Sequence, residues 1–304
     1  MMMSNTFTRV GSLIILRRCS QRQRNFCSKP KTLSFEENDL RAKFKALGKG
    51  DVQLHHLSGE QDGISVITMS NPSRRNALTG HMMVRLAEVV DELEKWQAGK
   101  ALILHGDAGT FVSGGDLSVL KEIHTPGEGE QMCYFMHKTF ARLQRLPLIS
   151  LAAIQGLAIG GGAEVALSCD YRLLSRTAEI KFVQARMGLT PGWGGGARLV
   201  QLVGRQKAME ILLQCKSMKL EESLMCGLVD GELPNDKDLV TSCTDWLAPY
   251  LRCSTSVIRA VKGVVSAGDS FQLDQALHVE RSIFSTMWAG EAHDEALSKK
   301  IKHK

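Results

Sequence analysis

The 304-residue sequence predicts an α/β fold, with strand-like segments in its first two thirds and helical segments in its last third. Three glycine-rich turns carry this prediction, because each lies between a strand-like run and a helical one. They occupy residues 106–117, 155–164 and 186–196. The hydrophobic content of 43% is sufficient for a core of one large domain.

The net charge of +6 is concentrated in an N-terminal arm. Residues 1–50 contain eleven Lys or Arg and three Asp or Glu, net +8, whereas the other residues contain 27 and 29, net −2. We therefore expect no nucleic-acid surface on the body of the protein. Residues 1–34 contain Arg, Ser and Thr and no acid, which is typical of a mitochondrial transit peptide and equally of a basic tail that targets nothing.

Apolar runs and cysteine spacing exclude two further classes. No run reaches the roughly 18 apolar residues that span a bilayer, so we expect no membrane partner. The eight cysteines are scattered, with no Cys-x-x-Cys and no His pair at metal spacing. This pattern favours reduced thiols in an intracellular compartment and predicts no metal site.

The elements follow in order from the hydrophobic pattern. Residues 52–57 and 64–69 flank turn-forming residues 58–63 and predict a strand pair. Thr79 is predicted to cap a helix with one apolar face, formed by Met82, Leu86, Val89, Val90, Leu93 and Trp96. Further strands are predicted over 101–104, 148–154, 170–174 and 179–183, and helices over 128–146, 208–213, 240–251, 256–265 and 271–287.

The central turn, within 155–170, contains the consecutive glycines 160–162 between a strand and a helix. Glycine permits backbone angles closed to other residues and lets a ligand lie on the main chain. The free N–H groups at the start of a helix suit an oxygen that becomes negative during a reaction. Glu164 falls in the first helical turn and faces either the ligand or solvent. The alternative is a tight packing turn with a surface Glu.

The turn over 106–117 also follows a strand and opens a helical pattern. Together, the two turns are able to offer one backbone N–H each to the same oxygen. A pair of donors is the minimum for an oxyanion hole.

Segments 111–117, 155–164 and 191–199 resemble, in order and spacing, the three signature segments of the crotonase (enoyl-CoA hydratase/isomerase) superfamily, and Asn71–Leu78 adds a fourth match. The resemblance spans Val52 to the C-terminus. It implies the crotonase (ClpP-like) fold, a spiral of repeated ββα units. The expected organisation is a basic arm over 1–50, a spiral core over 51–250 and a C-terminal helical region over 251–304 for trimerisation or for covering the site.

The resemblance also implies a site for coenzyme A thioesters. The N–H groups of Ser113 and Gly161 are expected to bind the thioester oxygen, with coenzyme A along 71–77 and 112–116. Arg74 or Arg75 either meets its phosphates or lies in a solvated turn, and Trp193 either lines the acyl pocket or packs. The implied substrate-binding residues are Arg74, Arg75, Ala77, Val112, Gly114, Gly115, Asp116, Gly160, Arg186 and Trp193. We expect a homotrimer or hexamer and no cofactor, because coenzyme A is part of the substrate.

One substitution separates this sequence from the hydratases of the superfamily, which use two glutamates. The first matches Glu164, but the second aligns with Arg186, and Arg cannot act as a base in a protein. Within the superfamily the sequence most resembles a group of thioester decarboxylases, which carry Glu at that position, so Arg186 departs from this group too. The residues that carry this closer resemblance are 71–74, 145–150, 182–183, 187–188, 193–195, 287–288 and Gly290.

This closer resemblance implies decarboxylation of ethylmalonyl-CoA to butyryl-CoA and, less well, of methylmalonyl-CoA to propionyl-CoA. Such an enzyme would remove side products of acetyl-CoA carboxylase. Glu164 is the candidate proton donor, or the group that orients the departing carboxylate. Arg186 either orients the substrate loosely, or points away and pairs with Glu164 or a surface acid.

Two other functions remain open. One is an enoyl-CoA hydratase or isomerase that uses Glu164 alone, and the other is a non-catalytic relative that binds acyl-CoA or RNA. The repair role predicts the cytosol, whereas the basic arm favours the mitochondrial matrix as the alternative.

Overall fold

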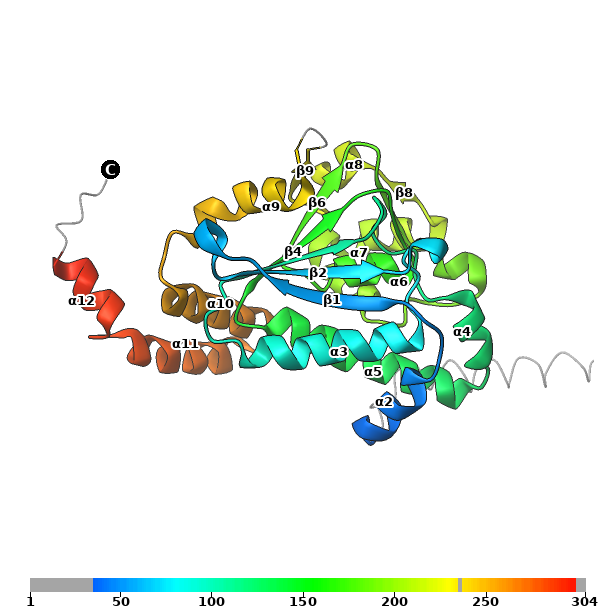
Figure 1. Cartoon of the computed structure of the whole chain (residues 1–304), viewed down its shortest axis with the longest axis horizontal. Coiled ribbons are helices and arrows are strands. Elements are labelled where there is room, and N and C mark those ends of the chain that lie inside the picture. Colours follow the sequence, from blue (N-terminus) through cyan, green and yellow to red (C-terminus); the bar gives the residue numbers. More distant parts are fainter. Residues whose placement is uncertain (1–34, 235–236, 299–304) are drawn as a thin grey trace, which may run out of the picture. The chain divides into compact units, whose positions relative to one another are not determined.

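The computed structural model describes residues 35–234 and 237–298 (Figure 1). Its main sheet has six strands in the order β1-β2-β3-β4-β6-β9. β1 is antiparallel to β2, and every other neighbouring pair is parallel. The carboxyl ends of β2, β3 and β4 therefore share one edge, where their loops meet. The strands are β1 (Asp51–His56), β2 (Ile64–Ser70), β3 (Ala101–Gly106), β4 (Ile149–Ile154), β6 (Tyr171–Ser175) and β9 (Gly231–Leu233).

A second sheet has three short strands, β5 (Leu157–Ile159), β7 (Glu179–Lys181) and β8 (Ser217–Met218). β5 is parallel to β7, and β8 is antiparallel to it. The sequence does not predict β5, β8 or β9, because two or three residues are too few to show a period. β5 lies within the central glycine turn, so this turn crosses from one sheet to the other before its helix begins.

Helices pack on both sides of the main sheet (Figure 1). α9 (Leu239–Leu247) covers one face, where Cys243 and Leu247 join a buried cluster with Ile64 and Ile103. α3 (Gly80–Lys95) packs against β1, with α5 (Pro126–Arg145) and α2 (Glu37–Lys45) beside it. These layers bury both faces of the parallel strands, as their continuous apolar sequences require.

α2 lies within residues 1–50, which the composition assigns to the arm, and it packs on the core. Leu40 and Phe44 are buried, and the rings of Phe44 and Phe135 are 5.5 Å apart. The interpretation of residues 1–34 as a transit peptide or a basic tail lies outside the described residues. The proposed boundaries at 50 and 250 stay a prediction.

The predicted cap of α3 is confirmed, because Thr79 Oγ1 accepts a hydrogen bond from the Met82 N–H at 3.2 Å. The later part of the chain is mainly helical, as predicted. It comprises α7 (Gly195–Gln214, interrupted at Gly204), α8 (Leu220–Met225), the short η5 (Ala248–Leu251), α10 (Thr255–Ser270), α11 (Leu273–Met287) and α12 (Glu291–Ser298).

α11 packs on α10 and, with α12, extends away from the main sheet (Figure 1). Large apolar side chains on this extension are exposed, including Leu277, Phe284 and Trp288. No helix in the described part of the chain is both long and apolar enough to cross a bilayer.

Candidate active site

The two predicted glycine turns lie against each other at the carboxyl edge of the main sheet. The Ile159 N–H donates to the Val112 carbonyl at 3.0 Å. A Cβ added at Gly114 would lie 3.5 Å from the Gly161 nitrogen, and one added at Gly162 would lie 1.8 Å from the Val112 oxygen. Glycine is therefore required sterically at Gly162, and the two turns meet as the sequence predicts.

The two predicted oxyanion donors lie on these adjacent turns, in different hydrogen-bonding states. Gly161 is the first residue of α6 (Gly161–Ala166), so no preceding helical turn supplies an acceptor for its N–H. The Ser113 N–H donates to the Arg75 carbonyl at 3.1 Å, and Ser113 Oγ donates to the Arg74 carbonyl at 3.0 Å. An oxygen that uses the Ser113 N–H must therefore replace or share the bond to Arg75.

Asn76 fastens the segment 71–78 to the glycine turn over 106–117, and the sequence analysis did not assign it to the site. Its side chain is buried and its backbone has φ of +55°, a left-handed conformation that Asn tolerates better than most residues. Asn76 Oδ1 accepts from the Asn71 N–H at 2.9 Å, and Nδ2 donates to the carbonyls of Asp107 and Thr110 at 2.8 Å each. The predicted Asn-Ala-Leu segment contains this residue, but its sequence does not reveal these partners.

The rest of the predicted coenzyme A segment is built around a bridge between Leu78 and Gly115. Ala77 is buried, and Asp116 caps α4 (Leu117–Glu122) by accepting from the Ser118 N–H at 2.8 Å. Burial raises the pKa of Asp116, but hydrogen bonds from Ser118 and the charge of Arg74 lower it, and the net pKa lies below the ordinary value. The side chains of Arg74 and Arg75 are exposed, which fits either a phosphate contact or a solvated turn.

Glu164 is buried, with an exposed fraction of 2%, so it is not the surface Glu of the alternative interpretation. Its carboxylate anchors the third glycine-rich loop. Oε2 accepts from the N–H groups of Trp193 at 2.7 Å and Gly195 at 2.8 Å. Oε1 accepts from Gln184 Nε2 at 2.9 Å and from the Gly192 N–H at 3.3 Å. Each carboxylate oxygen therefore has two donors.

The pKa of Glu164 is raised above the ordinary value of a glutamate, because burial opposes the charged form more than its hydrogen bonds favour it. A proton on this carboxyl must displace one N–H donor. The longest bond is the one from Gly192 to Oε1, so Oε1 is the oxygen that carries a proton at the lowest cost.

Trp193 covers the first residue of α6. Its side chain is buried, and a Cβ added at Gly161 would lie 2.3 Å from its Cζ3 atom. Gly160 has φ of +56° and donates its N–H to the Lys181 carbonyl at 2.8 Å, which ties the turn to β7. The structure thus brings Ser113, Gly161, Glu164 and Trp193 into one connected site.

Arg186 does not join this group. It lies on η4 (Gln184–Met187) and is exposed. Within 35–234 and 237–298 its side chain forms no ion pair or hydrogen bond, so the predicted pairing with Glu164 or with a surface acid is not found. All the donors to Glu164 are amide N–H groups.

Gln184 is the functional residue that the sequence analysis missed. It is 9% exposed, its Nε2 donates to Glu164, and its Oε1 has no hydrogen-bond partner among the described residues. No local pattern signals this role, because the two partners are 20 positions apart and the segment between them includes a strand of each sheet.

Replacing Gln184 by leucine, which has a similar volume, is expected to raise the pKa of Glu164 further. The side-chain hydrogen bond that favours the ionised carboxylate is lost. If protonated Glu164 is the active form, activity falls as pH rises through this pKa, and the falling limb moves to higher pH in Gln184→Leu. Initial rates across pH in both proteins measure this shift, and an unmoved or lowered limb would contradict it.

No group of three or more His, Cys, Asp or Glu in the described part of the chain is placed to hold a metal ion. Six cysteines lie in that part, and all of them are free thiols. Burial raises the pKa of Cys169 to about 12 and that of Cys243 to about 12. These two thiols are therefore protonated and unreactive near neutral pH.

The chain resembles known proteins over most of its length. The family model for enoyl-CoA hydratase/isomerase matches residues 59–301. The ethylmalonyl-CoA decarboxylase of Xenopus laevis is 44% identical over 89% of this chain and 90% of that protein, and that of Danio rerio is 43% identical over 95% and 94%. The crystal structure of an enoyl-CoA hydratase from Bacillus anthracis superposes with a TM-score of 0.75 at 21% identity, covering 82% of this chain and 95% of that one. The predicted crotonase fold is confirmed.

Proposed function

This chain belongs to the enoyl-CoA hydratase/isomerase family, and we propose that within it the protein is a carboxy-lyase. The proposed substrate is ethylmalonyl-CoA, which yields butyryl-CoA, and methylmalonyl-CoA is the poorer substrate, which yields propionyl-CoA. The relatives named ethylmalonyl-CoA decarboxylase, which match about nine tenths of the chain, support this substrate class.

One observation carries the choice of decarboxylation over hydration. The site has the adjacent backbone turns of Ser113 and Gly161 and the buried carboxylate of Glu164, whereas the position of the second glutamate of the hydratases is an exposed arginine. Hydration by two carboxylates requires a second acid or base at that position. Loss of CO2 requires no base, because the electron pair of the enolate comes from the broken bond to the carboxylate and not from removal of a proton.

In the proposed reaction the bond between the α-carbon and the carboxylate breaks, and CO2 leaves. The electron pair of the broken bond stays on the acyl fragment and forms the enolate, whose negative charge develops on the thioester oxygen. The N–H groups of Ser113 and Gly161 stabilise that oxygen, and one such donor typically contributes ~2.7–4 kcal/mol to lowering the barrier. Glu164 then transfers a proton from Oε1 to the α-carbon, which completes the acyl-CoA product.

The test is release of CO2 from ethylmalonyl-CoA by the purified full-length protein, with hydration of crotonyl-CoA followed in parallel. We expect CO2 release and formation of butyryl-CoA, with little hydration. Hydration without CO2 release would overturn the proposal in favour of a hydratase. Neither reaction, combined with binding of butyryl-CoA, would indicate a non-catalytic relative.

Replacing Arg186 by alanine is expected to change kcat for CO2 release by less than about threefold. The side chain is exposed and is not hydrogen-bonded to Glu164, and a strong ion pair with the departing carboxylate would stabilise the ground state and slow the reaction. Steady-state kinetics of Arg186→Ala against wild type measure the effect. Complete loss of activity would show that Arg186 takes part in the reaction.

We also propose that the protein is a homotrimer or a dimer of trimers that needs no cofactor. The exposed apolar side chains of α11 and α12 support self-association. Light scattering of the purified protein measures the mass, and a monomer would contradict this assembly. Full activity after exhaustive chelation and dialysis is expected.

We propose a cytosolic repair enzyme that removes side products of acetyl-CoA carboxylase. The substrate class supports this role, whereas the basic, acid-free composition of residues 1–34 favours the mitochondrial matrix. Imaging of residues 1–40 fused to a fluorescent protein tests the location, and mitochondrial fluorescence would contradict the cytosolic assignment.

A further inference from the structure

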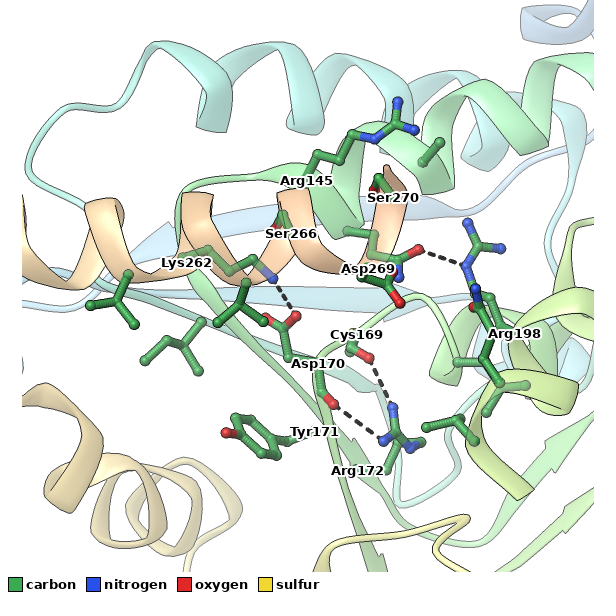
Figure 2. Close-up of a pocket in the computed structure, with 18 of the residues that line it drawn as sticks. Arg145, Cys169, Asp170, Tyr171, Arg172, Arg198, Lys262, Ser266, Asp269 and Ser270 are labelled. Atoms are coloured by element: carbon green, nitrogen blue, oxygen red, sulfur yellow. Dashed lines mark hydrogen bonds and ion pairs between the residues drawn. The ribbon is translucent and has the colours of Figure 1, made fainter. Parts of the chain in front are cut away.

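A cavity of about 980 Å³ lies between α5, α7 and α10, and its lining includes none of Ser113, Gly161 or Glu164 (Figure 2). Its size is at the upper end of the range found for small-molecule sites. Figure 2 shows Arg145 and Arg198 near the C-terminal part of α10, Arg145 beside Ser270 and Arg198 on the side of Asp269. None of the functional assignments above uses this space.

Two of the basic side chains that line the cavity are already neutralised. Arg172 forms an ion pair with Asp230 at 3.0 Å and donates to three backbone carbonyls. Lys262, which is buried, is paired with Asp170. The Lys262 pair joins α10 to the residue that precedes β6, and the Arg172 pair joins β6 to the residue that precedes β9.

Arg145 and Arg198 have no such partner. Among the residues that the structure describes, neither forms an ion pair with a carboxylate. Arg198 Nε donates to Gln144 Oε1 at 2.9 Å, and its NH1 donates to the Trp193 carbonyl at 3.3 Å. Both acceptors are uncharged, so the positive charge of Arg198 remains uncompensated by direct contact.

The electrostatic balance at this end of the cavity is positive. Burial lowers the pKa of Arg198 below its ordinary value, and the nearby charge of Arg145 lowers it further. The charges of Glu164 and Asp269 oppose this effect. Of these two carboxylates only Asp269 lines the cavity, where it faces the two guanidinium groups of Arg145 and Arg198. An anion placed between the two guanidinium groups would restore neutrality, and Arg is well suited to bind a carboxylate with two parallel hydrogen bonds.

Another part of the cavity lining is apolar. α10 contributes Val257, Val261 and Val265 along its length, and Val261 and Val265 are more than half exposed. Leu167 and Leu202 add to this apolar part from other elements. A ligand that is complementary to both the guanidinium groups and the apolar side chains has a negatively charged end and an extended hydrocarbon body.

We propose that this cavity binds a fatty carboxylate, with its carboxylate between Arg145 and Arg198 and its hydrocarbon chain along α10. The ligand is distinct from the thioester substrate, because the cavity lining excludes the proposed catalytic residues.

One link between the cavity and the proposed active site runs through Trp193. Trp193 accepts from Arg198 through its carbonyl, donates its N–H to Glu164 Oε2 at 2.7 Å, and places its ring on Gly161. A carboxylate that draws the Arg198 guanidinium toward it alters the hydrogen bond to Trp193. Binding in the cavity is therefore coupled to the site of the thioester, and the coupling is reciprocal.

Calorimetric titration of the purified full-length protein with decanoate tests the site, and it needs no turnover. We expect 1:1 binding per chain in wild type and roughly tenfold weaker binding in Arg145→Gln, because a charge-assisted contact is lost. Arg205→Gln is the matched control, since Arg205 is an exposed arginine on α7 that does not line the cavity. It should bind decanoate as wild type does.

Three results would overturn the site: no binding to wild type, equal binding to Arg145→Gln and wild type, or equal affinity for uncharged 1-decanol. A cavity filled by a neighbouring copy in an oligomer would give the first of these.

The coupling is measured as the affinity for butyryl-CoA with and without saturating decanoate. We expect at least a fivefold change in wild type that is largely lost in Arg145→Gln. An unchanged affinity would overturn the coupling. This second measurement rests on the proposed acyl-CoA function. If decanoate binds but butyryl-CoA does not, the proposed function fails and the cavity site stands.

Discussion

Gly161→Ala is expected to lower kcat for CO2 release by roughly 100- to 1,000-fold, the usual effect of losing one oxyanion donor. The added Cβ would lie 2.3 Å from Trp193 Cζ3 and less than 3 Å from two further atoms of the ring. Either the ring or the first residue of α6 must move, and movement of the latter displaces the N–H from the thioester oxygen. The backbone angle itself is no obstacle, because Gly161 does not have a positive φ.

Two companion variants isolate the cause. Gly129→Ala places the same Cβ on a helical glycine with no atom within 4 Å, so its rate should equal that of wild type. Combining Gly161→Ala with Trp193→Leu removes most of the ring and should recover part of the activity relative to Gly161→Ala alone. A Gly161→Ala enzyme within twofold of wild type would show that the Gly161 N–H is not a catalytic donor.

Glu164→Ala is expected to abolish CO2 release and also to destabilise the protein by about 3 kcal/mol. Four N–H donors lose their acceptor, and each unsatisfied buried donor costs ~1–3 kcal/mol unless water replaces the partner. Removal of a carboxylate that is costly to bury offsets part of this loss. Urea unfolding and the rate of CO2 release measure the two effects separately.

Glu164→Gln separates the anchoring role from proton transfer. Its amide oxygen still accepts two of the four hydrogen bonds, so Glu164→Gln should be more stable than Glu164→Ala, but an amide cannot deliver a proton. Because folding raises the pKa of Glu164, the wild-type protein loses stability as pH rises from the unfolded pKa through the folded one. The glutamine variant should lack this decline. A fully active Glu164→Gln would assign proton delivery to another group.

The sequence predicts the backbone of this site better than its side-chain contacts. The glycine turns were located correctly because glycine is required where two main chains approach as closely as they do at Val112 and Gly162. Glu164 was identified by its position, but its partners Gln184 and Gly195 are 20 and 31 residues away along the chain, and no local period encodes such contacts. The cavity beside Arg198 is built from four separate stretches between residues 137 and 270 for the same reason.

The extent of a helix is easier to predict than the existence of a short strand. The sequence predicts a helix over 128–146, and α5 extends from Pro126 to Arg145, since its apolar face and its terminal signals are local. β8 and β9 were missed because each strand is defined by pairing with a distant neighbour, β7 in one case and β6 in the other.

The hydrogen bond from the Ser113 N–H to the Arg75 carbonyl bears on how the enzyme distinguishes a bound thioester from its enolate. A neutral thioester oxygen that takes this N–H exchanges one carbonyl acceptor for another, so the exchange contributes little to substrate affinity. The enolate oxygen is anionic and forms a bond roughly twice as strong, a gain that the Arg75 carbonyl cannot match. The competing carbonyl therefore weakens binding of the ground state but leaves a net gain for the charged intermediate. A gain that is confined to the intermediate raises kcat without lowering KM.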